Sequence, residues 1–339
     1  MKPEVKPDGK PEPTRAVVFA YHNVGVRCLS VLLHHGVRIP LVVTHRDNPD
    51  ENIWFDSVEK LARVHGIPVI TPDDPNTPEV LEQVKAAEAD FLFSFYYRNM
   101  LKKPLLDTPK RGAYNMHGSL LPKYRGRVPV NWAIIHGERE TGATLHAMNE
   151  KPDNGAIVAQ QAIPILINDT AKEVFDKVTV AAEMALDRVL PALRIGRAPH
   201  LGQDLTQGAY FGGRKPEDGR IAWSLGAVAL HNFVRALSRP YPGAFADVEG
   251  RRLIIWRTVL GMGPAPALPG SGQAPALPGG GSAPASPGAG VRLGVAGDAL
   301  VLLCADGHWL RVIDLDVAGR PVAPGEFAGV FGRPWLQLA

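Results

Sequence analysis

The first hundred residues alternate short apolar runs with amphipathic stretches, and this alternation restricts the fold more than any other feature of the chain. Four runs rich in β-branched and aromatic residues lie at 16–21, 38–45, 67–72 and 90–97, and a helical pattern follows each of the first three. Strands that alternate with helices predict a parallel, doubly wound α/β sheet, whose ligand crevice lies beyond the carboxyl ends of its strands. We therefore expect the loops after Tyr21, Thr44 and Tyr97 and residues 115–119 to share one functional rim.

A long amphipathic helix and a β-rich second half follow. Thr170 and Glu173 form a capping-box pattern ahead of apolar residues at helical spacing, which predicts a helix over 170–196. Beyond Ala209 one short helical stretch and five short strands separated by turns predict a small β-barrel or sandwich. The expected organisation is therefore a disordered tail, an α/β domain and a β domain, over 1–15, 16–205 and 206–339.

Residues 261–290 interrupt the β-rich half. More than half of them are Gly or Pro, and the hexapeptide APALPG occurs there twice. A segment of this composition has little to bury and is typical of a flexible loop. Because strands of similar character flank it on both sides, we expect an insertion in a hairpin rather than a domain boundary.

Charge and composition exclude several classes of function. The chain has 37 Lys+Arg against 34 Asp+Glu, spread along its length, so a nucleic-acid partner is not indicated. It contains no apolar run that could span a bilayer, no secretory signal and only two distant cysteines, so we expect a cytoplasmic protein without membrane insertion or disulfides. The GxGxxG, P-loop, HExxH and CxxC patterns are absent, which favours a transfer reaction without a metal.

Asn115 and His117 are the strongest candidates for chemistry. They stand two residues apart in an extended segment and so point to the same side. An amide and an imidazole side by side offer a donor for an oxyanion and a group that moves a proton. Asp153 lies between two strand-like segments, and a hairpin could return its carboxylate to His117, where it would hold the ring and favour its charged form. From the residues alone, simple turns at both places stay open.

The segment NMHGSLLPKYRGR at 115–127, followed by DNGAI at 153–157, resembles the signature of the folate-dependent formyltransferases. The resemblance runs from about Ala16 to the C-terminus and implies a Rossmann-like catalytic domain followed by an OB-like domain. It implies 10-formyltetrahydrofolate as formyl donor and co-substrate, and Asn115, His117 and Asp153 as the catalytic trio. It also implies that the folate is bound by Asn99, Met100, Leu101, Arg127, Asn149, Glu150, Lys151, Pro152 and Asp153.

Three further segments indicate which molecule accepts the formyl group. FSFYYRNML at 93–101, FGGRKPED at 211–218 and YPGAF at 241–245 resemble family members that formylate UDP-4-amino-4-deoxy-L-arabinose, a nucleotide amino sugar of lipid A modification and polymyxin resistance. Two alternatives stay open: formylation of methionyl-tRNA, and binding of a nucleotide sugar or folate without catalysis. Some relatives carry a decarboxylating dehydrogenase after the formyltransferase, and the length of 339 residues predicts a stand-alone form of undetermined oligomeric state.

Overall fold

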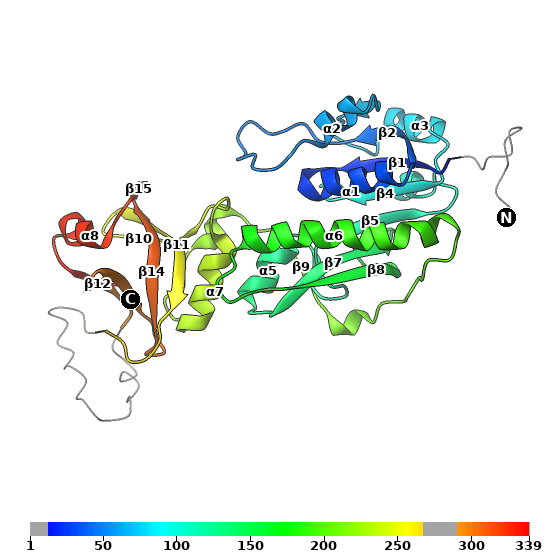
Figure 1. Ribbon diagram of the computed structural model, residues 1–339. Coiled ribbons are helices and arrows are strands. Elements are labelled where there is room, and N and C mark those ends of the chain that lie inside the picture. The colour runs from blue at the N-terminus through cyan, green and yellow to red at the C-terminus, as the bar shows by residue number, and fades with distance from the viewer. Residues whose placement is uncertain (1–12, 267–289, 339) are drawn as a thin grey trace, which may run out of the picture. The chain divides into compact units, whose positions relative to one another are not determined.

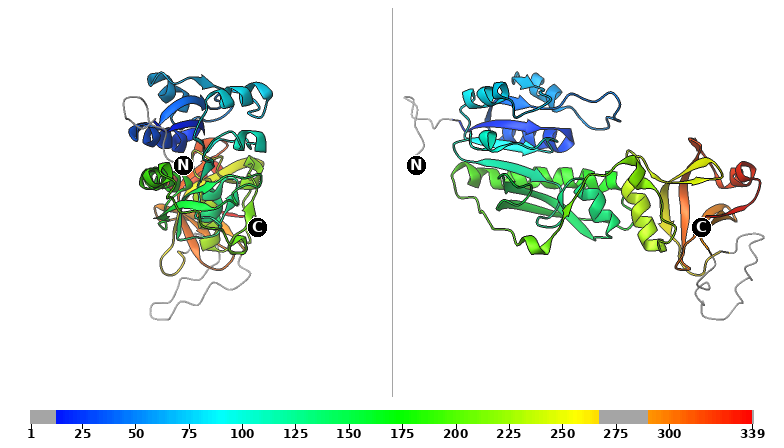
Figure 2. Two further views of the ribbon diagram at one scale, coloured as in Figure 1. Left: turned by 90° about the vertical axis from the view of Figure 1, so that its right-hand side faces the viewer. Right: turned by 180° about the vertical axis from the view of Figure 1, so that it is seen from behind.

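The chain divides into two compact units, each of which is built from separate stretches of sequence (Figures 1 and 2). The first unit contains the chain up to Pro129 together with Glu140–Pro164 and Phe175–Gly213. The second unit contains Val130–Arg139, Ile165–Val174 and the chain from Arg214 onward.

The computed structural model describes residues 13–266 and 290–338. The predicted disordered tail over 1–15 and the predicted insertion over 261–290 therefore lie for the greater part outside the described residues. The first described strand begins at Arg15, where the sequence changes from Pro and charged residues to a β-rich run.

A mixed seven-stranded sheet forms the centre of the first unit, in the order β3-β2-β1-β4-β5-β7-β8. The strands from β3 to β5 run parallel, as the alternation predicted, and β7 and β8 continue the sheet antiparallel. β4 is buried along its whole length, as a central strand covered on both faces must be. The strands are β1 (Arg15–Ala20), β2 (Arg38–Val43), β3 (Val69–Ile70), β4 (Phe91–Phe95), β5 (Ala113–His117), β7 (Glu140–Ala147) and β8 (Ile157–Pro164).

Helices follow the parallel strands and bury their apolar sides against them. One core cluster joins Val17 and Leu41 of the sheet to Val80 and Val84 of α3 and to Leu101 of the loop after β4. The helical patterns that the sequence predicted after the first three strands are therefore confirmed, whereas α4 and α5 were not predicted. The helices of the first unit in this part of the chain are α1 (His22–His34), α2 (Val58–Val64), α3 (Pro78–Ala86) and α4 (Lys103–Leu106). Helix α5 (Pro129–Ile135) lies almost wholly in the Val130–Arg139 stretch of the second unit.

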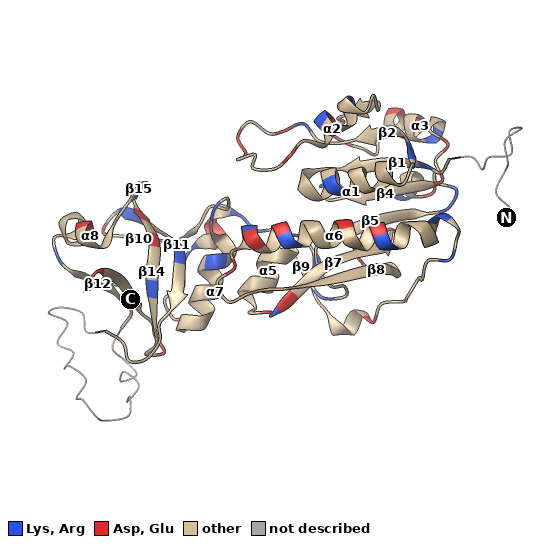
Figure 3. Cartoon of the chain, viewed as in Figure 1, with Lys and Arg blue, Asp and Glu red and all other residues tan. Residues whose placement is uncertain are grey.

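Helix α6 (Ala171–Arg194) confirms the long helix that the sequence predicted. The backbone N–H of Thr170 donates to the Glu173 carboxylate at 2.6 Å and the Glu173 N–H donates to the Thr170 hydroxyl oxygen at 3.5 Å, which together form the predicted capping box. The apolar residues at helical spacing are buried, whereas the exposed side carries charges of both signs (Figure 3). Neither α6 nor any other helix of the described residues is both long and apolar enough to cross a membrane.

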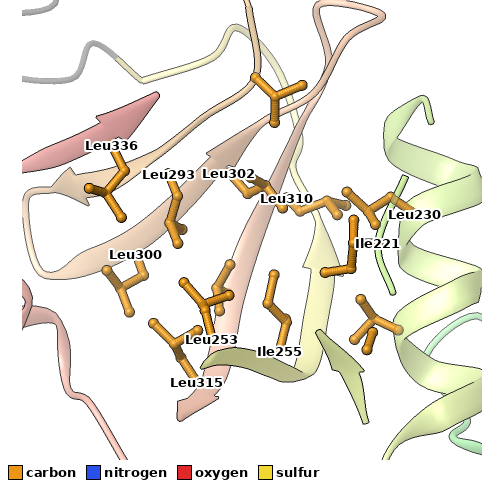
Figure 4. Close-up of a cluster of buried hydrophobic side chains, with 14 of the residues drawn as sticks. Ile221, Leu230, Leu253, Ile255, Leu293, Leu300, Leu302, Leu310, Leu315 and Leu336 are labelled. Carbon is orange, nitrogen blue, oxygen red and sulfur yellow. The ribbon is translucent and has the colours of Figure 1, made fainter. Parts of the chain in front are cut away.

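An antiparallel sheet forms the second unit, in the order β10-β11-β14-β13-β12-β16, and β15 pairs with β14. Leucine and isoleucine side chains from the strands meet Leu230 of α7 in one buried cluster (Figure 4). This half-barrel confirms the predicted β-rich domain. Its elements are α7 (Ala227–Leu237), β10 (Ala244–Val248), β11 (Arg251–Leu260), β12 (Arg292–Ala296), β13 (Ala299–Leu303), β14 (Trp309–Val317), β15 (Arg320–Pro321), α8 (Pro324–Phe331) and β16 (Trp335–Gln337).

The hairpin expected around residues 261–290 is wrong. β11 pairs with β10 and β14, and β12 pairs with β13 and β16, so the strands on either side of the segment are not neighbours. β14 is nearly as long as β11 and pairs with it from Leu253 to Leu260, which occupies the edge that a hairpin partner would need. The segment therefore connects two separated strands of the sheet.

Candidate active site

His117 ends strand β5 and is almost entirely withdrawn from solvent. Its Nε2–H donates to the carbonyl oxygen of Tyr124 at 2.8 Å, because a carbonyl can only accept. Its Nδ1 faces Oδ1 of Asp153 at 3.4 Å, which is longer than a well-formed N–H···O hydrogen bond. The imidazole therefore lies between two oxygen atoms, and these would satisfy both N–H groups of its doubly protonated form.

Asp153 stands in the turn between the antiparallel strands β7 and β8, and this hairpin brings it beside His117 as the sequence predicted. Its φ of +54° lies in the left-handed region, which aspartate tolerates better than most residues. The Gly126 N–H donates to its Oδ2 at 2.8 Å. The Gln203 side-chain amide donates to the carbonyl oxygens of Asp153 and Gly155 at 3.1 and 2.6 Å. Both the carboxylate and its backbone are thereby held in place.

The surroundings of Asp153 keep its carboxyl ionised. Burial alone would raise the pKa of Asp153, but the charge of His117 and hydrogen bonds from His146 and the Gly126 N–H outweigh burial and hold that pKa well below its ordinary value. The side chain is therefore a carboxylate at neutral pH. Within the described residues, no group of three or more His, Cys, Asp or Glu side chains could hold a metal ion.

Asn115 lies directly opposite His146 in the antiparallel pairing of β5 with β7. Side chains of such a pair stand on the same face of the sheet, and the Asn115 Nδ2 lies 3.1 Å from the His146 Nε2. That same Nε2 is 3.5 Å from Oδ1 of Asp153. Sequence reasoning missed His146, whose only signal was a histidine in a strand of otherwise small and apolar residues. The result is a buried cluster of four side chains: Asn115, His117, His146 and Asp153.

Hydrogen bonds fix the loop that follows His117. The Thr144 hydroxyl of β7 donates to the Ser119 carbonyl at 2.6 Å and accepts from the Leu121 N–H at 3.1 Å. The Ser119 hydroxyl donates to the Lys123 carbonyl at 2.6 Å. Further along, β6 (Arg125–Gly126) pairs with β9 (Tyr210–Phe211), which places the Gly126 N–H against Asp153.

The residues proposed for folate binding lie in three places. Asn99 donates to the Asp73 carbonyl at 3.0 Å, Met100 is largely exposed, and Leu101 is buried in the core cluster, where Met148 packs against it. Residues 149–152, which follow Met148, are all exposed. The segments 99–101 and 149–152 thus each adjoin this one core cluster, through Leu101 and Met148.

Arg127 lies on the loop after His117, next to β9. A Cβ at Gly213 would lie 3.4 Å from the Arg127 Nε, so the guanidinium covers this glycine. The Arg127 N–H donates to the Phe211 carbonyl at 2.9 Å, which ties its backbone to the β6–β9 pair. Arg127 is therefore positioned by the same strand pair that presents the Gly126 N–H to Asp153.

A second polar cluster occupies the carboxyl ends of β1, β2 and β4, as expected for the predicted rim. Tyr21 donates to Asp47 at 2.7 Å, and His45 stacks on Tyr97 with 4.1 Å between ring centroids. Burial and the nearby charge of Arg98 lower the pKa of His45 to about 4. Its neutral Nε2 accepts from the Arg98 N–H at 3.0 Å. These contacts join the loops after β1, β2 and β4.

Two family models match the chain, and together they span most of it. One, described as formyl transferase, matches residues 29–190, and the other, described as formyl transferase, C-terminal domain, matches residues 214–329. With the mixed α/β sheet and the half-barrel already described, these matches define an enzyme that transfers formyl groups. The chain belongs to the formyl transferase family.

Solved structures share the fold at low sequence identity. An N-formyltransferase from Helicobacter canadensis, solved with folinic acid and dTDP-3-aminofucose, has a TM-score of 0.64 and 20% identity over 88% of this chain and 98% of that chain. WlaRD, a sugar 3N-formyl transferase solved with dTDP and 5-N-formyl-THF, has a TM-score of 0.64 and 19% sequence identity, over 89% of this chain and 97% of that chain. A methionyl-tRNA formyltransferase from Clostridium thermocellum has a TM-score of 0.53 and 18% sequence identity, over 73% of this chain and 93% of that chain. At these identities the likeness establishes the fold.

Proposed function

We propose that this enzyme transfers the formyl group of 10-formyltetrahydrofolate to the amine of a nucleotide amino sugar. The observation that carries the proposal is the buried cluster in which Asn115, His117 and Asp153 converge at the carboxyl end of β5. Formyl transfer needs a donor for a developing oxyanion and a group that moves one proton, and these side chains supply both.

The reaction begins when the unprotonated amine attacks the formyl carbon, which gives a tetrahedral intermediate. Asn115 and protonated His117 stabilise its oxyanion, and the Asp153 carboxylate balances the charge of the imidazolium. His117 takes up the proton that the amine nitrogen loses and delivers one to N10 of the folate, directly or through water, so that His117 ends in the protonation state in which it began. The bond between the formyl carbon and N10 then breaks, leaving the formamide and tetrahydrofolate.

The folate is proposed to bind along Asn99–Leu101 and Asn149–Asp153, with Arg127 on the neighbouring loop. Support comes from one core cluster, which contains Leu101 and against which Met148 packs, next to the second segment. The buried Oδ1 of Asn154 has no hydrogen-bond partner within the described residues. A pteridine ring carries N–H donors that such an acceptor would bind.

For the acceptor, UDP-4-amino-4-deoxy-L-arabinose is the compound we favour. The segments HGSLLPKYRGRVPVNW at 117–132 and YPGAF at 241–245 are similar to the formyltransferase domain of the bifunctional polymyxin-resistance protein, which acts on this sugar. The structure of the Helicobacter canadensis enzyme with dTDP-3-aminofucose adds support for an amino sugar acceptor. Methionyl-tRNA is the second candidate, because one matching structure is a methionyl-tRNA formyltransferase. The two cysteines are buried and free, which suits the reducing cytoplasm.

An acceptor panel tests this proposal. Purified enzyme is given 10-formyltetrahydrofolate with UDP- and dTDP-linked amino sugars or with methionyl-tRNA, and the formylated products are identified by mass spectrometry. We expect the UDP-linked 4-amino sugar to be formylated fastest, and a folded His117→Ala variant to lose turnover. If only methionyl-tRNA were formylated, the proposal that the acceptor is a nucleotide amino sugar would be wrong. If the enzyme bound the sugar and the folate but formed no product, the proposal that it catalyses formyl transfer between them would be wrong.

A further inference from the structure

A pocket of about 580 Å³ opens in the second unit, and all of its lining residues belong to that unit. Trp132 and Ile135 stand three residues apart on α5, and Ala229 and Phe233 stand four apart on α7, so each helix presents one apolar side to the pocket. Leu225 adds a further apolar contact ahead of α7. We call this hollow the α5–α7 pocket. Its volume and its mainly apolar walls are those of an ordinary small-molecule site.

The polar side of the α5–α7 pocket comes from one short turn of the chain, which supplies Arg214, Asp218 and Arg220. The Lys215 N–H donates to the Asp218 Oδ2 at 2.7 Å, which holds that carboxylate at the start of the turn. Arg220 follows the turn and donates to Asp247 at 2.8 Å. Two guanidinium groups and one carboxylate are thus collected beside an otherwise apolar hollow.

Arg214 enters the pocket with its charge only partly compensated. Its guanidinium lies 4.8 Å from the centre of the Trp132 ring and 5.8 Å from that of Phe233. Its Nη2 donates to the carbonyl oxygen of Asp218 at 2.7 Å, whereas its buried Nε has no hydrogen-bond partner within the described residues. Burial lowers the pKa of Arg214, and nearby Asp218 offsets only part of this effect. A cation desolvated in this way costs free energy unless a ligand pairs with it.

A planar ring with two oxygen acceptors and one N–H donor matches these groups. Aromatic walls favour flat rings, on whose faces Trp and Phe side chains stack. Uracil and thymine carry two carbonyl oxygens with one N–H between them, whereas cytosine carries an amino group and an unprotonated ring nitrogen in the corresponding places. A guanidinium has five N–H donors, so Arg214 and Arg220 both keep donors beyond those already used, and the Asp218 carboxylate can only accept. The pocket therefore matches the first two bases and not cytosine.

We propose that the α5–α7 pocket binds the base of a uracil or thymine nucleotide. Arg214 and Arg220 donate to the two carbonyl oxygens of the base, and Asp218 accepts from the N–H between them. The site goes beyond the proposed function, which assigns no residue to the nucleotide. The nucleotide is either the one carried by the amino sugar acceptor or a separate molecule, and its binding does not require formyl transfer.

Isothermal titration calorimetry with uridine and cytidine monophosphates (UMP and CMP) tests the base preference of the full-length protein. The two nucleotides share their ribose and phosphate and differ only in the base. We expect UMP to bind at least about tenfold more tightly than CMP, because the ring nitrogen of cytosine would set a lone pair against the Asp218 carboxylate. Asp218→Asn keeps an acceptor for the Lys215 N–H but adds an amide donor for cytosine, so it should bring the two affinities together. UMP and CMP binding of equal strength in the wild type, or no binding of UMP, would overturn the proposal.

Arg214→Met separates a binding role from a packing role. Methionine keeps an apolar side chain beside Trp132 but removes the charge, so the affinity for UMP should fall about 10- to 100-fold while the urea midpoint stays the same or rises. Arg239→Met is the matched control, because Arg239 also stacks on a tryptophan of the second unit, Trp256, but pairs with Asp314 and lies outside the pocket lining. It should leave the affinity for UMP unchanged. A folded Arg214→Met variant that binds UMP as the wild type does would contradict the site, and the wild-type preference for UMP over CMP remains a test if this variant does not fold.

Competition in the transfer assay identifies the source of the nucleotide. If UMP raises the KM of the nucleotide sugar without changing kcat, and Arg214→Met removes this inhibition, the base is that of the acceptor. If UMP binds in the calorimeter but leaves that KM unchanged, a separate nucleotide occupies the pocket. Failure of the proposed function is recognised separately, because the calorimetry uses neither folate nor acceptor. An enzyme that formylates only methionyl-tRNA would still bind UMP at this site.

Discussion

Replacing Asp153 with asparagine removes one charge from the active-site cluster while preserving its shape. The new amide can still accept from the Gly126 N–H, and its backbone keeps the bonds from Gln203. What disappears is the negative charge 3.4 Å from the His117 Nδ1. The substitution therefore isolates the electrostatic contribution of Asp153 from its role in shaping the loop.

The expected size of the effect follows from that distance. Two unit charges 3.4 Å apart attract by about 5 kcal/mol at an effective dielectric constant of about 20. Loss of one member of a buried pair typically costs about 3–5 kcal/mol. If about 3–4 kcal/mol of this attraction stabilises the transition state, kcat falls about 10²–10³-fold, since about 1.4 kcal/mol corresponds to a factor of ten.

The assay is single-turnover formyl transfer with saturating folate and acceptor, followed by mass spectrometry of the formamide. Asp204→Asn is the control, because Asp204 is an exposed carboxylate that caps its own turn near Gln203. It should transfer formyl at the wild-type rate. An Asp153→Asn variant that is folded, binds folate and turns over within about tenfold of wild type would contradict the charge pairing of Asp153 with His117.

Three further outcomes are expected. Because the pKa of Asp153 is held below its unfolded value of about 3.9, the carboxylate stabilises the fold above that pH. Its contribution fades as pH falls below about 5, so urea midpoints of wild type and Asp153→Asn should converge in acid. Gly155→Ala should lose about 1–3 kcal/mol in urea unfolding, because a Cβ there would overlap a carbonyl oxygen of β7, whereas Gly202→Ala meets nothing and should unfold like wild type. Burial raises the pKa of the Cys304 thiol to about 12 and that of Cys28 still higher, so a thiol reagent at pH 8 should label neither until the chain is unfolded.

Local patterns in the sequence were sufficient for most of the secondary structure. The apolar run that became β4 and the Thr170–Glu173 capping box each specify their element through neighbours a few residues away. The place of Asp153 beside His117 was one of two interpretations that the sequence left open, and the hairpin of β7 and β8 decides between them. In each case the determining contacts are short in sequence or follow from one simple turn.

Contacts that depend on strand pairing could not be predicted. Nothing in the sequence around His146 says that it faces Asn115, since that follows from the register of β5 against β7. Gln203 donates to the Asp153 carbonyl although the two residues are 50 positions apart in the sequence, with helix α6 between them along the chain. The hairpin expected at 261–290 was wrong because of strand pairing as well. β11 pairs with β14, which is distant in sequence, whereas β12 pairs with β13. Each of these contacts is decided by packing between segments that are distant along the chain.

The pairing of Asn115 with His146 makes activity a measure of how the chain has folded. Side chains alternate between the two faces of a strand, so a slip of β7 by one residue would send His146 to the far face while Asn115 stayed in place. Molecules trapped in that state would retain most of their helices and much of their buried surface. In a refolding experiment, circular dichroism would count them as folded, whereas the yield of formyl-transfer activity would count only the correctly registered chains.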